Sequence, residues 1–249
     1  MLPGQEADRS SLLEVDFYDL AVDLTGGPER FSSRAEVRFR CRQPGNATFA
    51  DVEAAGVRRA VLNGADLDIT GAYQPGRLEL PQLAAENTLI VEADFGYATA
   101  GAGLHRVTGA DGFACTYSTA YPGGAPRIYC CFDQPDLRAP FTVSVHVPAG
   151  WSCVANGPVL SRPADGEAGM WKFAATHPIT PYLSSFCAGP FCGPAFICGD
   201  DGHRRVPVTA NALPAAATAL EAAALPDLFR HPAAVTAFVA LGLDGHDLK

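Results

Sequence analysis

Short segments that alternate apolar and polar residues, separated by glycine and proline, run through most of this chain. Such segments cover residues 18–24, 36–41, 87–95, 141–147 and 170–176. In the first of them Leu20, Val22 and Leu24 fall on one side, an alternation that is typical of a strand with one buried face. Antiparallel sheets commonly keep one face in water. The sequence therefore predicts a mainly β fold of antiparallel sheets, sandwich-like or saddle-shaped.

The character of the chain changes near residue 200. We expect a flexible N-terminus over residues 1–11, a β domain over 12–200 and a helical segment over 201–249, where the run PAAATALEAAAL is helix-prone. In the later part of that segment three apolar residues share one helical face, namely Val235, Phe238 and Val239. Because an exposed apolar face is normally covered, we expect this helix to face a partner.

Composition excludes several classes of function. Apolar residues make up 48% of the 249 residues, which is enough for a sizeable core, and the formal net charge is −9. Without clustered Lys and Arg, nucleic-acid binding is not expected. No apolar stretch reaches the roughly 20 residues of a membrane span, and the first residues do not form a secretory signal. We therefore expect a cytoplasmic protein whose eight cysteines are mostly buried apolar residues.

The histidines exclude one metalloprotease motif. None of the six is followed by Glu and no two are four residues apart, so the thermolysin-type H-E-x-x-H site is absent from the sequence. The set Cys187, Cys192, Cys198 and His203 has spacings too loose for a typical zinc site, and buried cysteines are the favoured interpretation. We expect no cofactor or metal in this chain itself.

The stretch CCFDQPDLRAPF, residues 130–141, indicates a loop of demanding geometry. Cys130 beside Arg127 could be a reactive thiol, although packing of both adjacent cysteines is favoured. A catalytic pocket in this part of the sequence would lack a set of nucleophile, base and orienting group. Its lining would be Thr119, Tyr121, Cys130, Arg127 and Asp133, with His105 and Arg106 joining from the GLHR turn. Loop packing and interface hydrogen bonds are the preferred interpretation.

Three stretches carry a resemblance to a known family. They are GLHRVTGADG at 103–112, CFDQPDLRAPFTVSVHVPAGWSCVANGPV at 131–159 and WKFAATHPITPYLSSFCAGPF at 171–191. They resemble the N-terminal, saddle-shaped β domain of the zinc aminopeptidases typified by aminopeptidase N, over about residues 12–195. The tail resembles the first segment of that family's catalytic domain and lacks its zinc motifs. The resemblance thus implies that zinc could come only from a partner chain.

In that family the loop before the CFDQP-type run reads T-Q-F-E-P, and its Gln or Glu holds the free amine of the substrate. This sequence has STAYP at 118–122, so Thr119 and Tyr121 occupy the two anchor positions. Neither a hydroxyl nor a phenol gives an ammonium the charge-assisted contact that a carboxylate gives. The resemblance further implies that the loop presses against the catalytic domain, through Arg127, Cys131, Phe132, Asp133, Gln134 and Pro135.

Three functional hypotheses follow from these patterns. The first is a non-catalytic, cleft-completing subunit of a split aminopeptidase-like enzyme, a heterodimer with a catalytic-type chain, recruited to natural-product biosynthesis on an amino-acid-like substrate. The second is a peptide-binding or regulatory module that adds a peptide strand to an exposed sheet edge. The third is a fragment of a full zinc aminopeptidase. In none of them is this chain an enzyme by itself.

Overall fold

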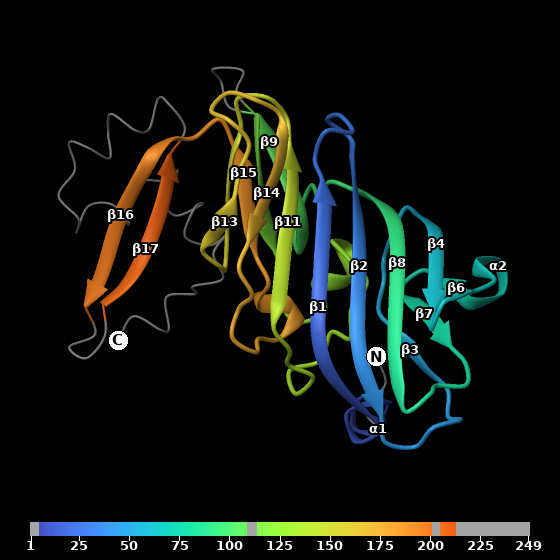
Figure 1. Cartoon of the computed structure of the whole chain (residues 1–249). Helices are drawn as coiled ribbons and strands as arrows, with labels where there is room; N and C mark the ends of the chain where they lie inside the picture. The colour runs from blue at the N-terminus through green and yellow to red at the C-terminus, as the bar shows by residue number, and fades with distance from the viewer. Residues whose placement is uncertain (1–4, 109–113, 201–204, 213–249) are drawn as a thin grey trace.

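A computed structural model describes residues 5–108, 114–200 and 205–212 of the chain (Figure 1). Its largest sheet has eight strands in the order β13-β14-β11-β1-β2-β8-β4-β5. The bounds of these strands are β13 (Val159–Ser161), β14 (Gly169–Phe173), β11 (Phe141–Val147), β1 (Leu13–Asp23), β2 (Arg30–Cys41), β8 (Glu86–Gly96), β4 (Gly56–Leu62) and β5 (Ala65–Asp66).

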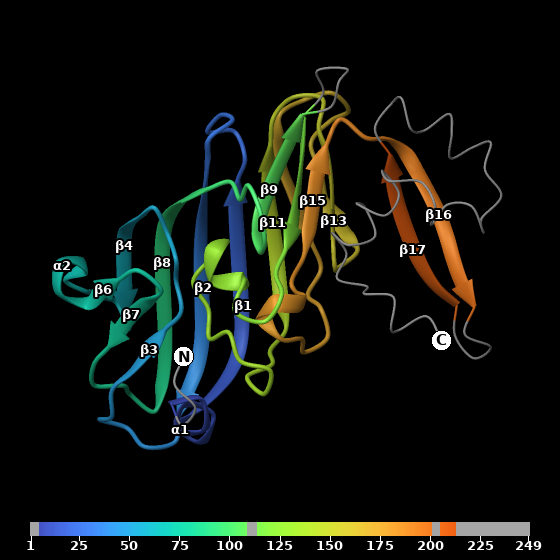
Figure 2. The same ribbon diagram turned by 180° about the vertical axis from the view of Figure 1, so that it is seen from behind.

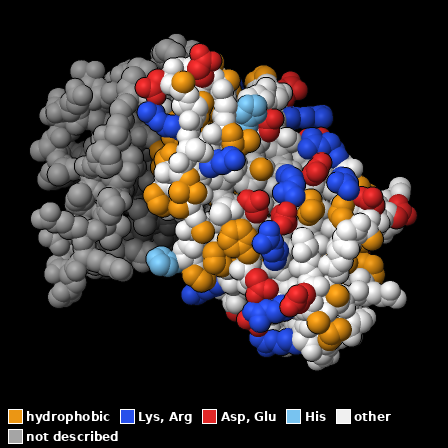
Figure 3. Space-filling model, in the orientation of Figure 1, with side chains coloured by type: hydrophobic (Ala, Val, Ile, Leu, Met, Phe, Trp, Pro, Cys, Tyr) orange, Lys and Arg blue, Asp and Glu red, His pale blue; other side chains and the backbone are white. Residues whose placement is uncertain are grey.

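The alternation of the sequence sets the two faces of this sheet. On β2, for example, Phe31, Val37 and Phe39 are 2% exposed or less. The alternate residues Ser32, Arg34, Glu36 and Arg38 are polar and lie on the other face, where charged side chains of both signs are interspersed (Figure 3). Arg34 and Glu36 pair there at 2.9 Å. The predicted period of two is therefore confirmed as one buried and one solvated face.

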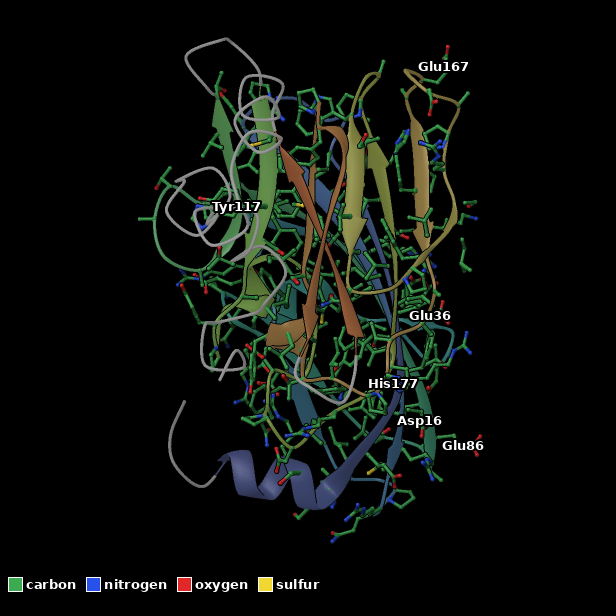
Figure 4. All side chains as sticks on the ribbon, turned by 90° about the vertical axis from the view of Figure 1, so that its left-hand side faces the viewer. Asp16, Glu36, Glu86, Tyr117, Glu167 and His177 are labelled. Atoms are coloured by element: carbon green, nitrogen blue, oxygen red, sulfur yellow. The ribbon has the colours of Figure 1, made fainter. Side chains whose placement is uncertain are left out.

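Two smaller sheets lie behind the large one, as the reverse view shows (Figure 2). The four-stranded sheet has the order β12 (Ser152–Ala155), β15 (Phe186–Gly189), β10 (Ala114–Thr119) and β9 (Gly103–Thr108), and the three-stranded sheet has the order β3 (Thr48–Ala50), β7 (Arg77–Leu80) and β6 (Tyr73–Gln74). In the side view Asp16, Glu36 and Glu86 of the large sheet lie on one side, and Tyr117 of β10 lies on the opposite side (Figure 4). The core fills the space between these layers, so the predicted mainly β architecture is confirmed.

One strand pair of the large sheet departs from the expected antiparallel pattern. β1 pairs with β2 in the antiparallel sense and with β11 in the parallel sense, with Tyr18 opposite Phe141. The two rings stack with 4.3 Å between their centroids. A parallel neighbour requires a long crossover, and here 117 residues separate β1 from β11. Local alternation carries no information about such a distant partner.

The N-terminal segment differs from the flexible lead-in that the sequence predicts for residues 1–11. Gln5–Leu12 form helix α1, and Arg9 on this helix is 2% exposed. The physical reason is that Arg9 finds a buried acidic partner, described below. The remaining short helical elements are α2 (Ile69–Ala72) and the 3₁₀ turns η1 (Ala125–Arg127) and η2 (Pro181–Leu183). None of the described helices is long and apolar enough to cross a membrane.

The last described strands form a hairpin of their own, β16 (Cys192–Asp200) and β17 (Arg205–Ala212). We expect a helical segment from residue 201, and for residues 205–212 this is wrong. The stretch contains three β-branched residues, Val206, Val208 and Thr209, which favour a strand. The predicted partner-facing residues Val235, Phe238 and Val239 lie outside the described residues.

Candidate functional site

The CFDQP loop, residues 131–135, is fixed by hydrogen bonds of its backbone. The Asp51 amide donates to the Cys131 carbonyl at 2.7 Å, and the Cys131 amide donates back to the Asp51 carbonyl at 3.0 Å. The Phe132 amide donates to the Tyr18 hydroxyl at 3.0 Å. The Phe132 side chain is fully buried. The loop therefore has one conformation imposed by the strands around it.

A buried charged group, which we call the Arg9 cluster, lies beside the loop and consists of Arg9, Asp51, Asp133 and Gln134. Arg9 Nη1 lies 2.8 Å from Asp51 Oδ2, and the two side chains are 1% and 5% exposed. Arg9 Nε donates to Gln134 Oε1 at 2.5 Å. The Asp133 amide donates to the same Asp51 Oδ2 at 2.8 Å. Because a buried charge is tolerated only with a countercharge and hydrogen bonds, this cluster joins helix α1 firmly to the loop.

Burial opposes ionisation of both acids in the Arg9 cluster. It raises the pKa of Asp133 to about 6, the charge of Asp51 adds to the rise, and the amides of Gly123 and Ala125 oppose it. Burial likewise raises the pKa of Asp51, against the attraction of Arg9. Asp133 Oδ1 is buried and has no hydrogen-bond partner among the described residues. Arg9 attracts both carboxylates, and Arg77 outside the cluster also attracts Asp51, yet burial makes ionisation of the second acid costly.

The turn at residues 120–124, which we call the Tyr121 turn, holds one altered anchor position at the surface. Asp133 Oδ2 accepts the Gly123 amide at 2.8 Å, and the Gly124 amide donates to the Tyr121 carbonyl at 2.7 Å. A Cβ at Gly124 would come within 2.9 Å of that carbonyl oxygen, so glycine is required. Tyr121 is 60% exposed, whereas Thr119 at the end of β10 is 9% exposed. Of these two anchor residues, the phenol is the one presented to solvent.

The structure buries several residues that the resemblance assigns to an interface. Cys131 and Phe132 are 0% exposed, Gln134 is 2% exposed and Asp133 is 8% exposed. The side chains of these four residues are enclosed by the domain itself. They shape the loop from within, and Pro135 beside them is exposed. Contact of the loop with a catalytic domain stays a prediction.

Arg127 does not activate the adjacent cysteines. Its Nε lies 3.1 Å from Glu53 Oε2 in a half-exposed ion pair. Burial raises the pKa of the Cys130 and Cys131 thiols far above the ordinary value. A reactive cysteine needs an electropositive, accessible setting, and this one is apolar and closed. The prediction that both cysteines pack in the interior is confirmed.

The loosely spaced set consists of Cys187, Cys192, Cys198 and His203, and the structure describes the side chain of Cys187 alone. Cys187 on β15 is buried, and burial raises the pKa of its thiol to about 12. The side chains of Cys192 and Cys198, and all of His203, lie outside the described residues. Among the side chains that the structure describes, no three His, Cys, Asp or Glu residues gather in a metal-binding group.

Sequence patterns did not identify Arg9, Asp51 and Glu53. Charged residues are mostly exposed, so Arg9 in a polar N-terminal stretch is expected in solvent. The available signal was the run FADV at 49–52, in which Asp51 interrupts apolar residues that are themselves buried. An acid in such a run needs a buried partner, but the sequence does not say which cation supplies it.

Comparisons with known proteins agree with this architecture. A family model described as Peptidase M1 N-terminal domain matches residues 15–183. Aminopeptidase N of Streptomyces lividans is 35% identical over 234 residues, which cover 92% of this chain and 27% of that protein. A probable aminopeptidase 1 of Sulfurisphaera tokodaii is 38% identical over 67 residues, 27% of this chain and 8% of that protein.

Among solved structures, a mutant M1 zinc metallopeptidase from Deinococcus radiodurans has the same fold. The TM-score is 0.66 at 20% identity, and the match covers 82% of this chain and 48% of that chain. This chain thus spans about a quarter of the Streptomyces relative and about half of the solved structure. The sequence match and the shared fold place the chain in one family: it belongs to the peptidase M1 N-terminal domains.

Proposed function

We propose that this domain completes the substrate cleft of an aminopeptidase-like enzyme, by packing the side that carries the Tyr121 turn against an M1-type catalytic domain on a separate chain. The observation that carries the proposal is the turn that presents the exposed Tyr121, because the Gly123 amide of this turn donates a hydrogen bond to Asp133 of the buried cluster. Tyrosine is enriched at protein interfaces, and a pre-organised turn loses little freedom on binding.

The substrate of the proposed complex differs from that of an ordinary family member. A carboxylate at the position of Tyr121 would pair with an ammonium, whereas a phenol offers a hydroxyl and an aromatic face. We therefore propose an amino-acid-like substrate whose amine is modified or is held elsewhere, as in a biosynthetic reaction. Zinc, if the complex uses it, would be held by the catalytic-type chain.

A binding experiment tests the contact directly. The full 249-residue chain is mixed with the portion of Streptomyces lividans aminopeptidase N beyond the stretch that this chain matches, and titrated by calorimetry. We expect a one-to-one complex that Tyr121→Ala weakens about tenfold or more, equivalent to about 1.4 kcal/mol. The matched control is Leu160→Ala, which removes another exposed apolar side chain, on β13. Absence of a complex, or equal weakening by both variants, would overturn the proposal.

An activity measurement tests the substrate assignment. In an active complex, Tyr121→Glu restores the acidic anchor and should lower KM for an amino-acid amide with a free α-amine, while kcat changes little. An N-acetylated amide is the control, because it carries no ammonium to recognise. Equal changes in KM for both substrates would contradict an amine-anchoring role at this position.

The same contact would form if the two parts belong to one longer polypeptide. The reading frame beyond Lys249 and the neighbouring genes distinguish the two arrangements. A continuous frame carrying the zinc motifs would refute the separate subunit while leaving the cleft-completing role in place.

Peptide capture is a second candidate, favoured by the edge strand β13. Val159 and Leu160 on this strand are 47% and 70% exposed, at one end of the eight-stranded sheet. An extended peptide can add to such an edge through its backbone. Calorimetry against peptide pools separates the two candidates, because a cleft-completing domain alone should bind none of them.

A further inference from the structure

Helix α1 is connected to the Tyr121 turn by a series of hydrogen bonds. Arg9 Nη1 holds Asp51 Oδ2 at 2.8 Å, and the same oxygen accepts the Asp133 amide at 2.8 Å. Asp133 Oδ2 in turn accepts the Gly123 amide, two residues after Tyr121, at 2.8 Å. Each acceptor in this series is a carboxylate oxygen.

We propose that Arg9 is a positioning residue that sets the conformation of the CFDQP loop and, through Asp51 and Asp133, of the Tyr121 turn. The consequence for a substrate cleft rests on the proposed function, whereas the positioning itself is a property of this chain. A helix near the N-terminus would thereby control a surface more than one hundred residues further along the sequence.

The surroundings of Arg9 favour a specific role over general packing. Its guanidinium lies 4.5 Å from the centre of the Phe49 ring and 5.9 Å from that of Phe132, so the rings restrict its plane. In that plane Nη1 points to Asp51 and Nε points to Gln134. Lysine has the charge but lacks the planar fork, so it could not reproduce both contacts.

Hydrogen exchange resolved by mass spectrometry tests the inference on the full chain. The variants are Arg9→Met, Arg9→Lys and the double variant Arg9→Met with Asp51→Asn. The double variant also replaces the carboxylate that faces Arg9 with a neutral amide, so that Asp133 is the one carboxylate of the cluster left without Arg9. We therefore expect it to be measurable even where the single variant fails to fold. Arg59→Met is the matched control, because Arg59 also pairs with an acid, Asp66, but both side chains are more than half exposed.

We expect the amides of residues 119–137 to exchange about tenfold faster or more in Arg9→Met and in the double variant. Residues 86–96 of β8 should change much less, and Arg9→Lys should rescue the loop in part. A merely structural role would accelerate exchange throughout the domain, and this outcome would overturn the inference. The inference would also be overturned if residues 119–137 of the double variant exchange at the same rate as in the wild type.

The inference and the proposed function can fail separately. The exchange measurement needs no partner. If Arg9→Met accelerates exchange in the loop but the chain binds no catalytic domain, the positioning role of Arg9 is supported and the cleft-completing function is refuted. Conversely, if the complex forms but the Arg9 variants exchange in the loop at the wild-type rate, the cleft-completing function is supported and the positioning role of Arg9 is refuted.

Discussion

Asp133 should make the stability of this domain fall as the pH rises from about 4 to about 6. Its folded pKa is raised to about 6, whereas an unfolded aspartate has a pKa near 3.9. Between these values the unfolded chain has released a proton that the folded chain still binds, so rising pH favours unfolding. The contribution is fully present below about pH 4 and is lost as the pH passes the folded pKa.

The magnitude follows from the same two pKa values. Each pKa difference of one corresponds to about 1.4 kcal/mol, so the full effect is at most about 3 kcal/mol. Between pH 5 and pH 7 the free energy of unfolding should fall by about 1 kcal/mol. The neighbouring Cys131 and Tyr129 stay neutral in this range because burial raises their pKa values well above it.

Urea denaturation of wild type and Asp133→Asn, followed by circular dichroism, isolates this effect. Subtracting the two curves removes the contributions of the other acids, such as Asp23, whose pKa is lowered. The wild type should lose about 1 kcal/mol relative to the variant from pH 5 to pH 7, a midpoint difference of about 0.5 M urea. Asp165→Asn is the control, since the Asp165 side chain is 83% exposed.

Two results would refute this reasoning. A difference between wild type and Asp133→Asn that stays constant from pH 5 to pH 7 would mean that burial does not shift this group. A wild type that gains stability relative to the variant as the pH rises would mean that Arg9 dominates and lowers the Asp133 pKa.

Three further predictions concern packing. Tyr18→Phe removes the acceptor of the buried Phe132 amide and should lower the free energy of unfolding, measured in urea, by about 1–3 kcal/mol. An unchanged free energy of unfolding would contradict this hydrogen bond. Gly157→Ala would place a Cβ 2.1 Å from the Ala174 carbonyl oxygen and should lower the free energy of unfolding by about 1–3 kcal/mol or more in the same assay. An unchanged free energy would show that the two segments separate at no cost. Cys187 should resist a thiol reagent at pH 8 until urea unfolds the domain, and rapid labelling of the native protein would show that its pKa is not raised.

The sequence predicts the strands well because their burial repeats with a period of two. Val37 and Phe39 are buried and Arg38 between them faces solvent, as the alternation indicates. Pairings across long separations were not predictable in the same way. The parallel contact of Tyr18 with Phe141 depends on a crossover that no local pattern records.

The candidate site was predictable only in part. The CFDQP run indicates a constrained loop, and the structure explains the constraint by Tyr18 and Asp51. Arg9 was not found because a buried arginine has the same local sequence context as an exposed one. Its position depends on an acid 42 residues away and an amide 125 residues away. Such clusters become visible only when distant segments are brought together.

The parallel pairing of β1 with β11 has a consequence for the order of folding. β1 is synthesised before β11, so one of its two edges is completed only when Phe141–Val147 emerge. During synthesis that edge exposes unpaired amides and carbonyls, which invite association with other chains. Ribosome-bound chains that stop before Phe141 should therefore need chaperone protection that longer ones do not.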